Sequence, residues 1–129
     1  MEIITHQMID QELCGKPIAV SQGQSRIEML TTDRMTADAS GLVHGGFIFG
    51  LADYAAMLAV NHPNVVLGAA DVKFLKPVQA NQTVVAQAKV GETKGKKQVV
   101  AVEVLKGDEK IFEGAFVCFT LEQHVLGDV

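Results

Sequence analysis

The stretch GLVHGGFIFGLADYAAMLAVN, residues Gly41 to Asn61, decides the fold of this 129-residue chain. Its Ala, Leu and Met residues favour helix, and apolar residues occupy nearly all sides, which predicts a long helix from Gly46 to about Asn61 enclosed by protein. His62-Pro63-Asn64 ends the helix, because proline cannot continue the helical hydrogen bonds. One carboxylate, Asp53, lies inside this apolar helix, where an ionised group is costly unless something compensates it.

After the helix the apolar pattern changes from period 3.6 to period 2, which predicts four strands joined by short turns. The expected strands are Val65–Val78, Thr83–Thr93, Lys97–Lys106 and Lys110–Leu121. Before the helix we expect a short helix within Met1–Leu13, one strand over Ala19–Thr32 and a loop from Thr32 to Gly41. One apolar helix packed on an antiparallel sheet of about five to six strands is an α+β arrangement. The length indicates a single domain over residues 1–129.

Composition excludes several classes of function. The net charge of −4, the absence of Trp and the single Tyr argue against nucleic acid as a partner. No apolar run reaches the roughly 20 residues of a membrane helix, and the acidic stretch MEIITHQMIDQEL is not expected to be a signal peptide. Cys14 and Cys118 lack metal or redox spacing, so we expect reduced thiols in a cytoplasmic protein, with a disulfide left open. The histidines show no metal-binding spacing, and we expect no metal.

The start of the long helix is suited to binding an oxygen that carries negative charge. Gly45 and Gly46 permit a tight turn and close approach of a ligand. The first N–H groups of a helix lack internal acceptors, and the helix dipole adds positive charge there. The carbonyl of a thioester or ester, on becoming an oxyanion, would fit such a site. The alternative for the two glycines is close packing of helix on strand.

Asp53 follows Gly46 by seven residues, so the two residues face almost the same way on the helix. Seven rises of ~1.5 Å separate them by about 10 Å along the axis. One carbonyl cannot therefore contact both groups of the same helix. If both act on one substrate, Asp53 comes from a neighbouring subunit, with a two-fold axis that makes the helices antiparallel. The alternative for Asp53 is a structural carboxylate that accepts hydrogen bonds from a partner subunit.

HGG followed by LAD, with the acid nine residues after His44, resembles the hotdog-fold acyl-CoA thioesterases, in the branch of the phenylacetate-pathway thioesterase. The resemblance covers roughly Ser21 to Leu121 and implies a helix wrapped by an antiparallel sheet. It implies dimers that pair their sheets edge to edge and can associate into tetramers, acting on acyl-CoA without a cofactor. By position, Asp53 would activate water or attack the thioester, and the amide of Gly45 or Gly46 would polarise its carbonyl.

The chain departs from that family at one position. Many members of the branch carry Asn six residues before the HGG histidine, where it helps to place the nucleophilic water, and this chain has Asp38. An aspartate accepts from water but cannot donate an amide N–H. A second carboxylate near Asp53 would also raise one of the two pKa values. The departure leaves open a second hypothesis, a hotdog protein that binds or senses acyl-CoA without hydrolysing it.

The substrate would be bound by apolar and basic side chains. The helix flank is expected to line an acyl pocket, with Tyr54 able to lend a hydroxyl; the residues are Phe47, Phe49, Tyr54 and Leu58. His44 is expected to fix the loop by hydrogen bonds. Two basic groups could contact the phosphates of coenzyme A, although the first also fits a solvated hairpin; they are Lys94, Lys96 and Lys97, and Lys73 and Lys76. A hotdog dehydratase or hydratase would need a histidine–carboxylate arrangement that the sequence lacks.

Overall fold

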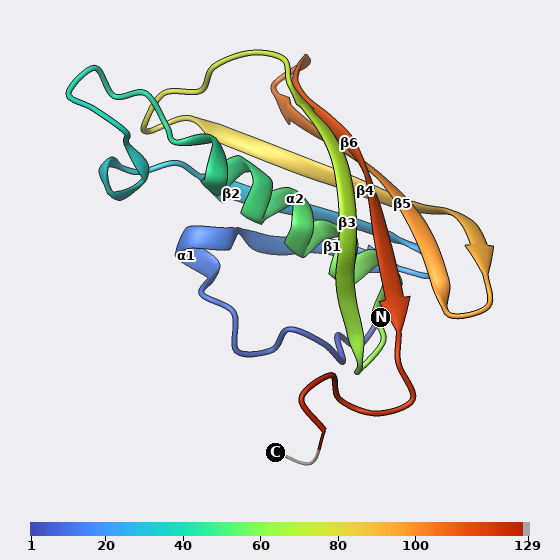
Figure 1. Cartoon of the computed structure of the whole chain (residues 1–129). Coiled ribbons are helices and arrows are strands. Elements are labelled where there is room, and N and C mark those ends of the chain that lie inside the picture. Colours follow the sequence, from blue (N-terminus) through green and yellow to red (C-terminus); the bar gives the residue numbers. More distant parts are fainter. Residues whose placement is uncertain (128–129) are drawn as a thin grey trace.

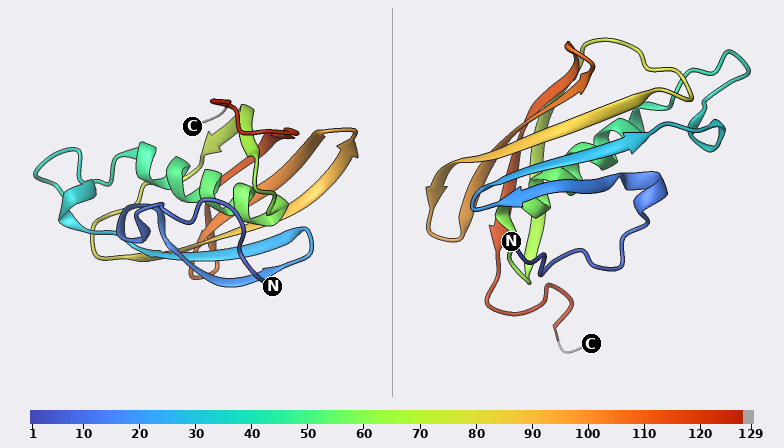
Figure 2. Two further views of the ribbon diagram at one scale, coloured as in Figure 1. Left: turned by 90° about the horizontal axis from the view of Figure 1, so that it is seen from below. Right: turned by 180° about the vertical axis from the view of Figure 1, so that it is seen from behind.

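The computed structural model describes residues 1–127 and contains one long helix and one six-stranded sheet (Figure 1). The elements in chain order are α1 (Gln11–Cys14), β1 (Lys16–Ser21), β2 (Gln24–Leu30), a 3-10 turn (Asp33–Met35), α2 (Gly45–Val60), β3 (Val65–Phe74), β4 (Thr83–Lys94), β5 (Lys97–Lys106) and β6 (Glu109–Thr120). The sheet is antiparallel throughout, in the order β1-β2-β4-β5-β6-β3. It curves around α2, as the views from below and behind show (Figure 2). The predicted α+β architecture is therefore confirmed.

Helix α2 forms where the apolar stretch predicts it. Nine of its residues are buried, among them Leu51, Ala55 and Leu58 at 0% exposure. The helix ends at Asn61, which adopts the left-handed conformation with φ of 50° and donates its N–H to the Met57 carbonyl. These contacts hold the helix in the core with its N-terminus free at one end of the sheet.

The inner face of the sheet supplies the other half of the core. Along β2, Ser25, Ile27 and Met29 point inward and alternate with exposed residues, as a half-buried strand requires. Ser25 is polar but satisfied, because its hydroxyl donates to the Ala55 carbonyl of α2 at 2.6 Å. The strand is thereby fixed to the helix both by apolar packing and by a buried hydrogen bond.

The predicted single strand over Ala19–Thr32 is wrong, because the chain turns back within it. β1 and β2 form an antiparallel hairpin around Gln22-Gly23, and Gly23 has φ of 73°. A glycine with positive φ is the residue that a tight hairpin turn favours. The extra strand lengthens the sheet to six and places β1 at one edge.

The predicted helix within Met1–Leu13 is also wrong for most of its length. Only α1 is helical; it begins after Asp10, whose carboxylate accepts from the N–H groups of Glu12 and Leu13. The residues before it are held by the end of α2 instead: Asn61 accepts from the Ile4 N–H at 3.0 Å and donates to the Glu2 carbonyl at 2.8 Å. Tertiary hydrogen bonds therefore override the local apolar spacing.

The sheet has two free edges, β1 and β3. In the middle of the β3 edge, residues 68–71 are exposed, and three of them have small side chains or none: Gly68, Ala69 and Ala70. Exposed edges of this kind can pair with another strand. Within residues 1–127, no helix is long and apolar enough to cross a membrane.

Candidate functional site

The N-terminus of α2 presents two amide groups that are free of protein partners. The neighbouring amides are satisfied: the His44 N–H donates to Met35 at 2.8 Å, and the Phe47 N–H donates to His44 at 3.0 Å. The N–H groups of Gly45 and Gly46 have no acceptor among residues 1–127. His44 precedes the helix without capping it through its side chain. The pair is thus available to an oxygen from outside the protomer.

Both positions leave little room for a side chain. A Cβ at Gly45 would lie 3.1 Å from the Phe74 ring, and a Cβ at Gly46 would lie 3.0 Å from the His44 ring. The His44 imidazole itself is exposed and meets the Phe47 ring edge-on, with 6.2 Å between ring centroids. Close packing, one of the two sequence interpretations of the glycines, therefore applies here, and approach of a ligand stays a prediction.

Asp53 combines partial burial with an unsatisfied oxygen. Its Oδ1 is buried and has no hydrogen-bond partner among the described residues. Burial raises the pKa of Asp53 from its usual 3.8 to about 6, and no cation offsets it. The charge of Asp53 in turn contributes, after burial, to the raised pKa values of the Cys14 and Cys118 thiols, the latter to about 12. The Asp53 carboxylate therefore lies among thiols and apolar groups. These surroundings bring its pKa closer to neutral pH, where a carboxylate can act as a proton acceptor.

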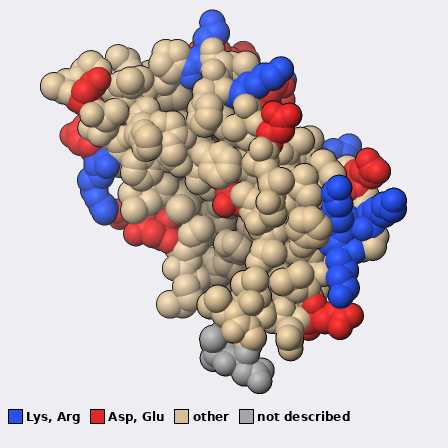
Figure 3. All heavy atoms as spheres, viewed as in Figure 1, with Lys and Arg blue, Asp and Glu red and all other residues tan. Residues whose placement is uncertain are grey.

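One stripe of α2 remains open along its length. It consists of Gly46, Phe49, Gly50 and Asp53, which are spaced i, i+3, i+4 and i+7 and are half-buried or exposed. A Cβ at Gly50 would meet nothing within 4 Å. Figure 3, seen from the side shown in Figure 1, shows a face dominated by uncharged atoms around a hollow, with most charges near the rim and one small acidic patch near the middle. Gly46 and Asp53 lie on the same stripe but about 10 Å apart along the axis.

A separate cavity of about 270 Å³ reaches Gly45 from another side of the helix. It is lined by Val43, Gly45, Ile48, Phe74, Leu75, Lys76, Pro77, Val78 and Ile111. Phe74, which the sequence analysis did not single out, is one of these lining residues and meets Phe112 edge-on, with 5.1 Å between ring centroids. Nothing in the local sequence signals Phe74, because its role depends on contact with a helix almost 30 positions away.

The structure separates several of the residues that the sequence grouped together. Tyr54 and Leu58 are buried in the core at 2% and 0% exposure and do not line the three cavities described here, so their place in an acyl pocket stays a prediction. Tyr54 lies one residue beyond Asp53, about 100° around the helix, where the N-terminal segment covers it and His6 packs on its ring. Phe49 instead packs on Phe116, with 5.5 Å between ring centroids.

Asp38 lies in the exposed loop before α2. Its carboxylate accepts from the N–H and the hydroxyl of Ser40, and these bonds lower the pKa of Asp38. Asp38 does not contribute to the raised pKa of Asp53 in the same protomer, for which burial is the cause. Within one protomer the two carboxylates therefore do not behave as a coupled pair.

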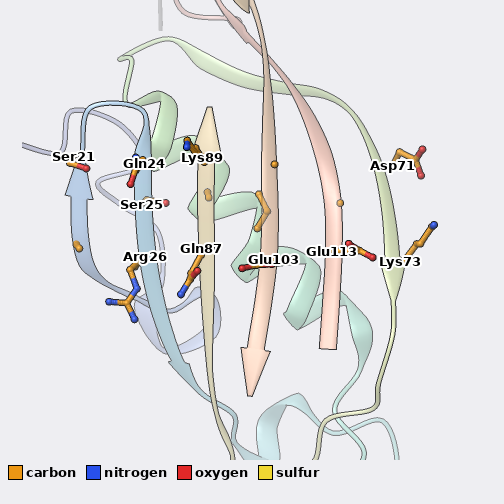
Figure 4. Close-up of a pocket in the computed structure, with 15 residues that line it drawn as sticks. Ser21, Gln24, Ser25, Arg26, Asp71, Lys73, Gln87, Lys89, Glu103 and Glu113 are labelled. Carbon is orange, nitrogen blue, oxygen red and sulfur yellow. The ribbon is translucent and has the colours of Figure 1, made fainter. Parts of the chain in front are cut away.

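The five predicted lysines fall into three places. Lys76 lines the cavity beside Gly45. Lys73 faces a groove of about 650 Å³ on the outer face of the sheet, together with Arg26, Glu103 and Glu113 (Figure 4). The group Lys94, Lys96 and Lys97 lies on the β4–β5 turn.

That basic turn is at the end of the sheet near the C-terminus of α2. The Lys96 carbonyl accepts from the Thr120 N–H, and Asn64 just after the helix donates to Leu121. Lys96 also pairs with Glu122 at 3.1 Å. Within residues 1–127, no group of three or more His, Cys, Asp or Glu residues is placed to hold a metal ion.

Comparison with known proteins identifies the class. Residues 40–113 match the thioesterase superfamily, so the chain belongs to that family, and its fold is the hotdog fold. A crystal structure of a protein from Pyrococcus horikoshii is 52% identical, with a TM-score of 0.97 over 98% of this chain and 97% of that one. A variant of the phenylacetic acid degradation protein PaaI from Thermus thermophilus is 25% identical, with a TM-score of 0.79 over 86% and 97% of the two chains.

Curated relatives include proteins of different functions. The chain is 57% identical over 116 residues to methylthioribose-1-phosphate isomerase of Aquifex aeolicus, which covers 90% of this chain and 25% of that protein. It is 27% identical to the transcription factor FapR of Caldanaerobacter subterraneus over 92% of this chain and 60% of that protein. It is 29% identical to the acyl-coenzyme A thioesterase PaaI of Escherichia coli over 81% and 79%. The chain thus spans about a quarter of the length of the isomerase and 60% of the length of that FapR protein.

Proposed function

We propose that the protein hydrolyses the thioester of an acyl-CoA, with Asp53 as general base and the amides of Gly45 and Gly46 as the oxyanion site. The observation that carries this proposal is the unsatisfied, half-buried carboxylate of Asp53 on the same open stripe as Gly46, whose amide is free like that of Gly45. Membership of the thioesterase superfamily and the similarity to PaaI support the same reaction.

The site is completed by a second copy of the chain. A two-fold axis passing beside Phe49 and Gly50, midway between Gly46 and Asp53, would bring each glycine pair to the partner's carboxylate. Gly50 supports this arrangement, because its missing side chain lets two helices approach closely. The free edge of β3, with its small exposed residues, would pair with the same strand of the partner. Two such dimers can associate further into a tetramer.

The chemistry follows from these positions. The substrate carbonyl accepts hydrogen bonds from the glycine amides, and Asp53 takes a proton from water as the water oxygen bonds to the carbonyl carbon. The tetrahedral oxyanion is stabilised by the amides and by the helix dipole. Its collapse breaks the carbon–sulfur bond, and the leaving thiolate takes the proton back from Asp53. The products are a carboxylic acid and free coenzyme A, and no cofactor enters the reaction.

Coenzyme A is strongly anionic, so cations near the site would hold its phosphates. Lys76 is the predicted lysine nearest the glycine amides of the same protomer, since it lines the cavity that Gly45 also lines. In an antiparallel dimer the partner's Lys94, Lys96 and Lys97 would come toward the same end, because that turn lies near the C-terminus of α2. Lys73 faces the outer groove, and a role in binding would require the nucleotide to extend over the sheet.

The test is thiol release from a panel of acyl-CoA thioesters. We expect Asp53→Asn to lower kcat by about 10²–10⁴-fold, the usual contribution of a general base, while binding of intact substrate persists. Asp108→Asn, an exposed carboxylate in the β5–β6 turn, is the matched control and should retain full activity. Equal rates for wild type and Asp53→Asn would refute the proposal.

The second candidate is a binding protein without turnover. The similarity to the transcription factor FapR favours it, as does the replacement of the family asparagine by Asp38. Thiol release at the buffer rate for every thioester, together with tight binding of intact acyl-CoA, would establish this alternative. The variant Asp38→Asn then offers a direct comparison, because gain of hydrolysis would assign the loss to that position.

A further inference from the structure

The cavity beside Gly45 lies on a different side of α2 from the stripe that carries Asp53. Gly45 precedes Gly46 by one residue and therefore faces about 100° away around the helix. Seven side chains that line the cavity are apolar, and the single charged one, Lys76, belongs to the exposed β3–β4 loop. A carbonyl bound at the two glycine amides would thus have an apolar cavity immediately next to it.

The walls of this cavity are held in place by backbone hydrogen bonds between segments far apart in the sequence. The Ile111 carbonyl accepts from the N–H groups of Leu75 and Lys76 at 2.9 and 3.2 Å. The Val78 carbonyl accepts from the Val43 N–H at 2.8 Å. The loop from β3, the start of β6 and the approach to α2 are therefore tied together, and the cavity is preformed rather than opened by the ligand.

We propose that this cavity receives the acyl group of the substrate and selects neutral, compact acyl groups. The inference rests on the proposed thioesterase function and adds the substrate class to it. A volume of about 270 Å³ holds roughly nine non-hydrogen atoms at ~30 Å³ each. A terminal carboxylate would lose its hydration against the apolar walls, so dicarboxylic monothioesters are selected against.

Phe74 lines the cavity directly beside Gly45. Its ring lies against Gly45, where a Cβ would be 3.1 Å away, and it is braced edge-on by Phe112. The side chain is nevertheless 56% exposed, so the fold does not depend on its full burial. Phe74 is therefore a specificity-determining residue that can be changed without emptying the core.

The length dependence of turnover gives the first readout. In the wild type we expect kcat/KM to rise about fourfold per added methylene, as each one leaves water, until the acyl group fills the cavity. Beyond about nine non-hydrogen atoms the gain should stop. Straight-chain acyl-CoAs from acetyl to dodecanoyl, with a succinyl thioester as the charged comparison, cover this range.

Two variants of the rim shift the limit in opposite directions. In Phe74→Ala, the acyl length at which kcat/KM stops rising should increase by about three methylenes, because the lost ring leaves that much room. Leu75→Trp should shorten that limit. Leu30→Ala is the matched control, because Leu30 is also 56% exposed but lies at the end of β2 away from the cavity. Thermal unfolding of each variant separates a shifted profile from a loss of fold.

Binding of thioether analogues, in which the scissile ester is replaced, separates this inference from the proposed hydrolysis. Affinity that rises with chain length to the same limit, and shifts in Phe74→Ala, supports the cavity even if no thioester is hydrolysed. Hydrolysis or binding with an identical length profile in wild type, Phe74→Ala and Leu75→Trp overturns it. Preference for the succinyl thioester over butyryl-CoA overturns it as well.

Discussion

Asp53 has a buried oxygen that no donor reaches within the described chain, and its position on α2 explains why. The neighbouring turns of the helix carry apolar side chains or glycines, and the thiols of Cys14 and Cys118 are the titratable groups that sense its charge. Burial therefore acts on the carboxylate without compensation and raises its pKa to about 6. The same feature that suits a base imposes a cost on the folded state above that pH.

The first prediction concerns stability and pH. Asp53 holds a proton with a pKa of about 6 when folded and near 3.8 when unfolded. The folded chain therefore binds more protons between these values, and the free energy of unfolding falls as pH rises through them, by about 3 kcal/mol when complete. Asp53→Asn lacks this loss. The free energy of unfolding of the variant, relative to that of wild type, should rise by about 2 kcal/mol from pH 4 to pH 7.5, as measured by urea unfolding.

An equal stability difference between the two proteins at both pH values would contradict the raised pKa. The other carboxylates are present in both proteins, so their titration cancels in the comparison.

The second prediction concerns Gly46. A side chain there would press on the His44 ring, since even a Cβ would lie 3.0 Å from it. We expect Gly46→Val to lower kcat by about 10²-fold or more, the usual effect of disturbing an oxyanion donor. The melting temperature should change by only a few degrees, because Gly46 is exposed at the helix start. Full activity in this variant would exclude the glycine amides from the reaction.

At the scale of elements, the open stripe of α2 and the free edge of β3 are two features that a lone protomer leaves uncovered. Gly50 lies in the middle of the stripe with space around it. Glycine within a helix costs about 1 kcal/mol relative to alanine, so a larger residue there should favour the helix of an isolated protomer. In the proposed helix pairing, by contrast, a larger residue at Gly50 is unfavourable, because the two helices need the glycine for close approach.

The third prediction uses this conflict. Gly50→Leu should dissociate the protein to protomers at micromolar concentration and abolish thiol release, while helix content is kept. Mass in solution and circular dichroism measure the two effects. Ala101→Leu, which adds the same side chain on the exposed outer face of β5, is the control and should remain associated and active. A Gly50→Leu protein that stays associated and active contradicts helix pairing at this position.

At the scale of the whole molecule, the distance of about 10 Å between Gly46 and Asp53 along one rigid helix decides how many chains a site needs. The two groups cannot approach each other by any side-chain movement within α2. Under the proposed mechanism each site would therefore combine Asp53 of one chain with the glycines of another, and a dimer would have two such sites.

The fourth prediction follows from that pairing. Asp53→Asn and Gly46→Val proteins, each inactive alone, should recover about a quarter of wild-type activity when unfolded together and refolded as an equal mixture. Half of the dimers are then mixed, and each mixed dimer has one site with both groups intact. Recovery is measured as thiol release, with each variant refolded alone as the control. No recovery despite mixed dimers would place both groups in one chain or outside the mechanism.

The sequence by itself determined the long helix, the four strands after it and the common direction of Gly46 and Asp53, since these depend on residue periods of 3.6 and 2 that are local. The hairpin at Gly23 was also present in the sequence as a glycine turn, but the loose alternation around it indicated a single strand. Only the tertiary structure decided the burial of Tyr54, the exposure of Asp38 and the cavity that Phe74 forms with Gly45. These features join segments that are distant in sequence, and their geometry depends on how the sheet curves around the helix, which no local pattern specifies.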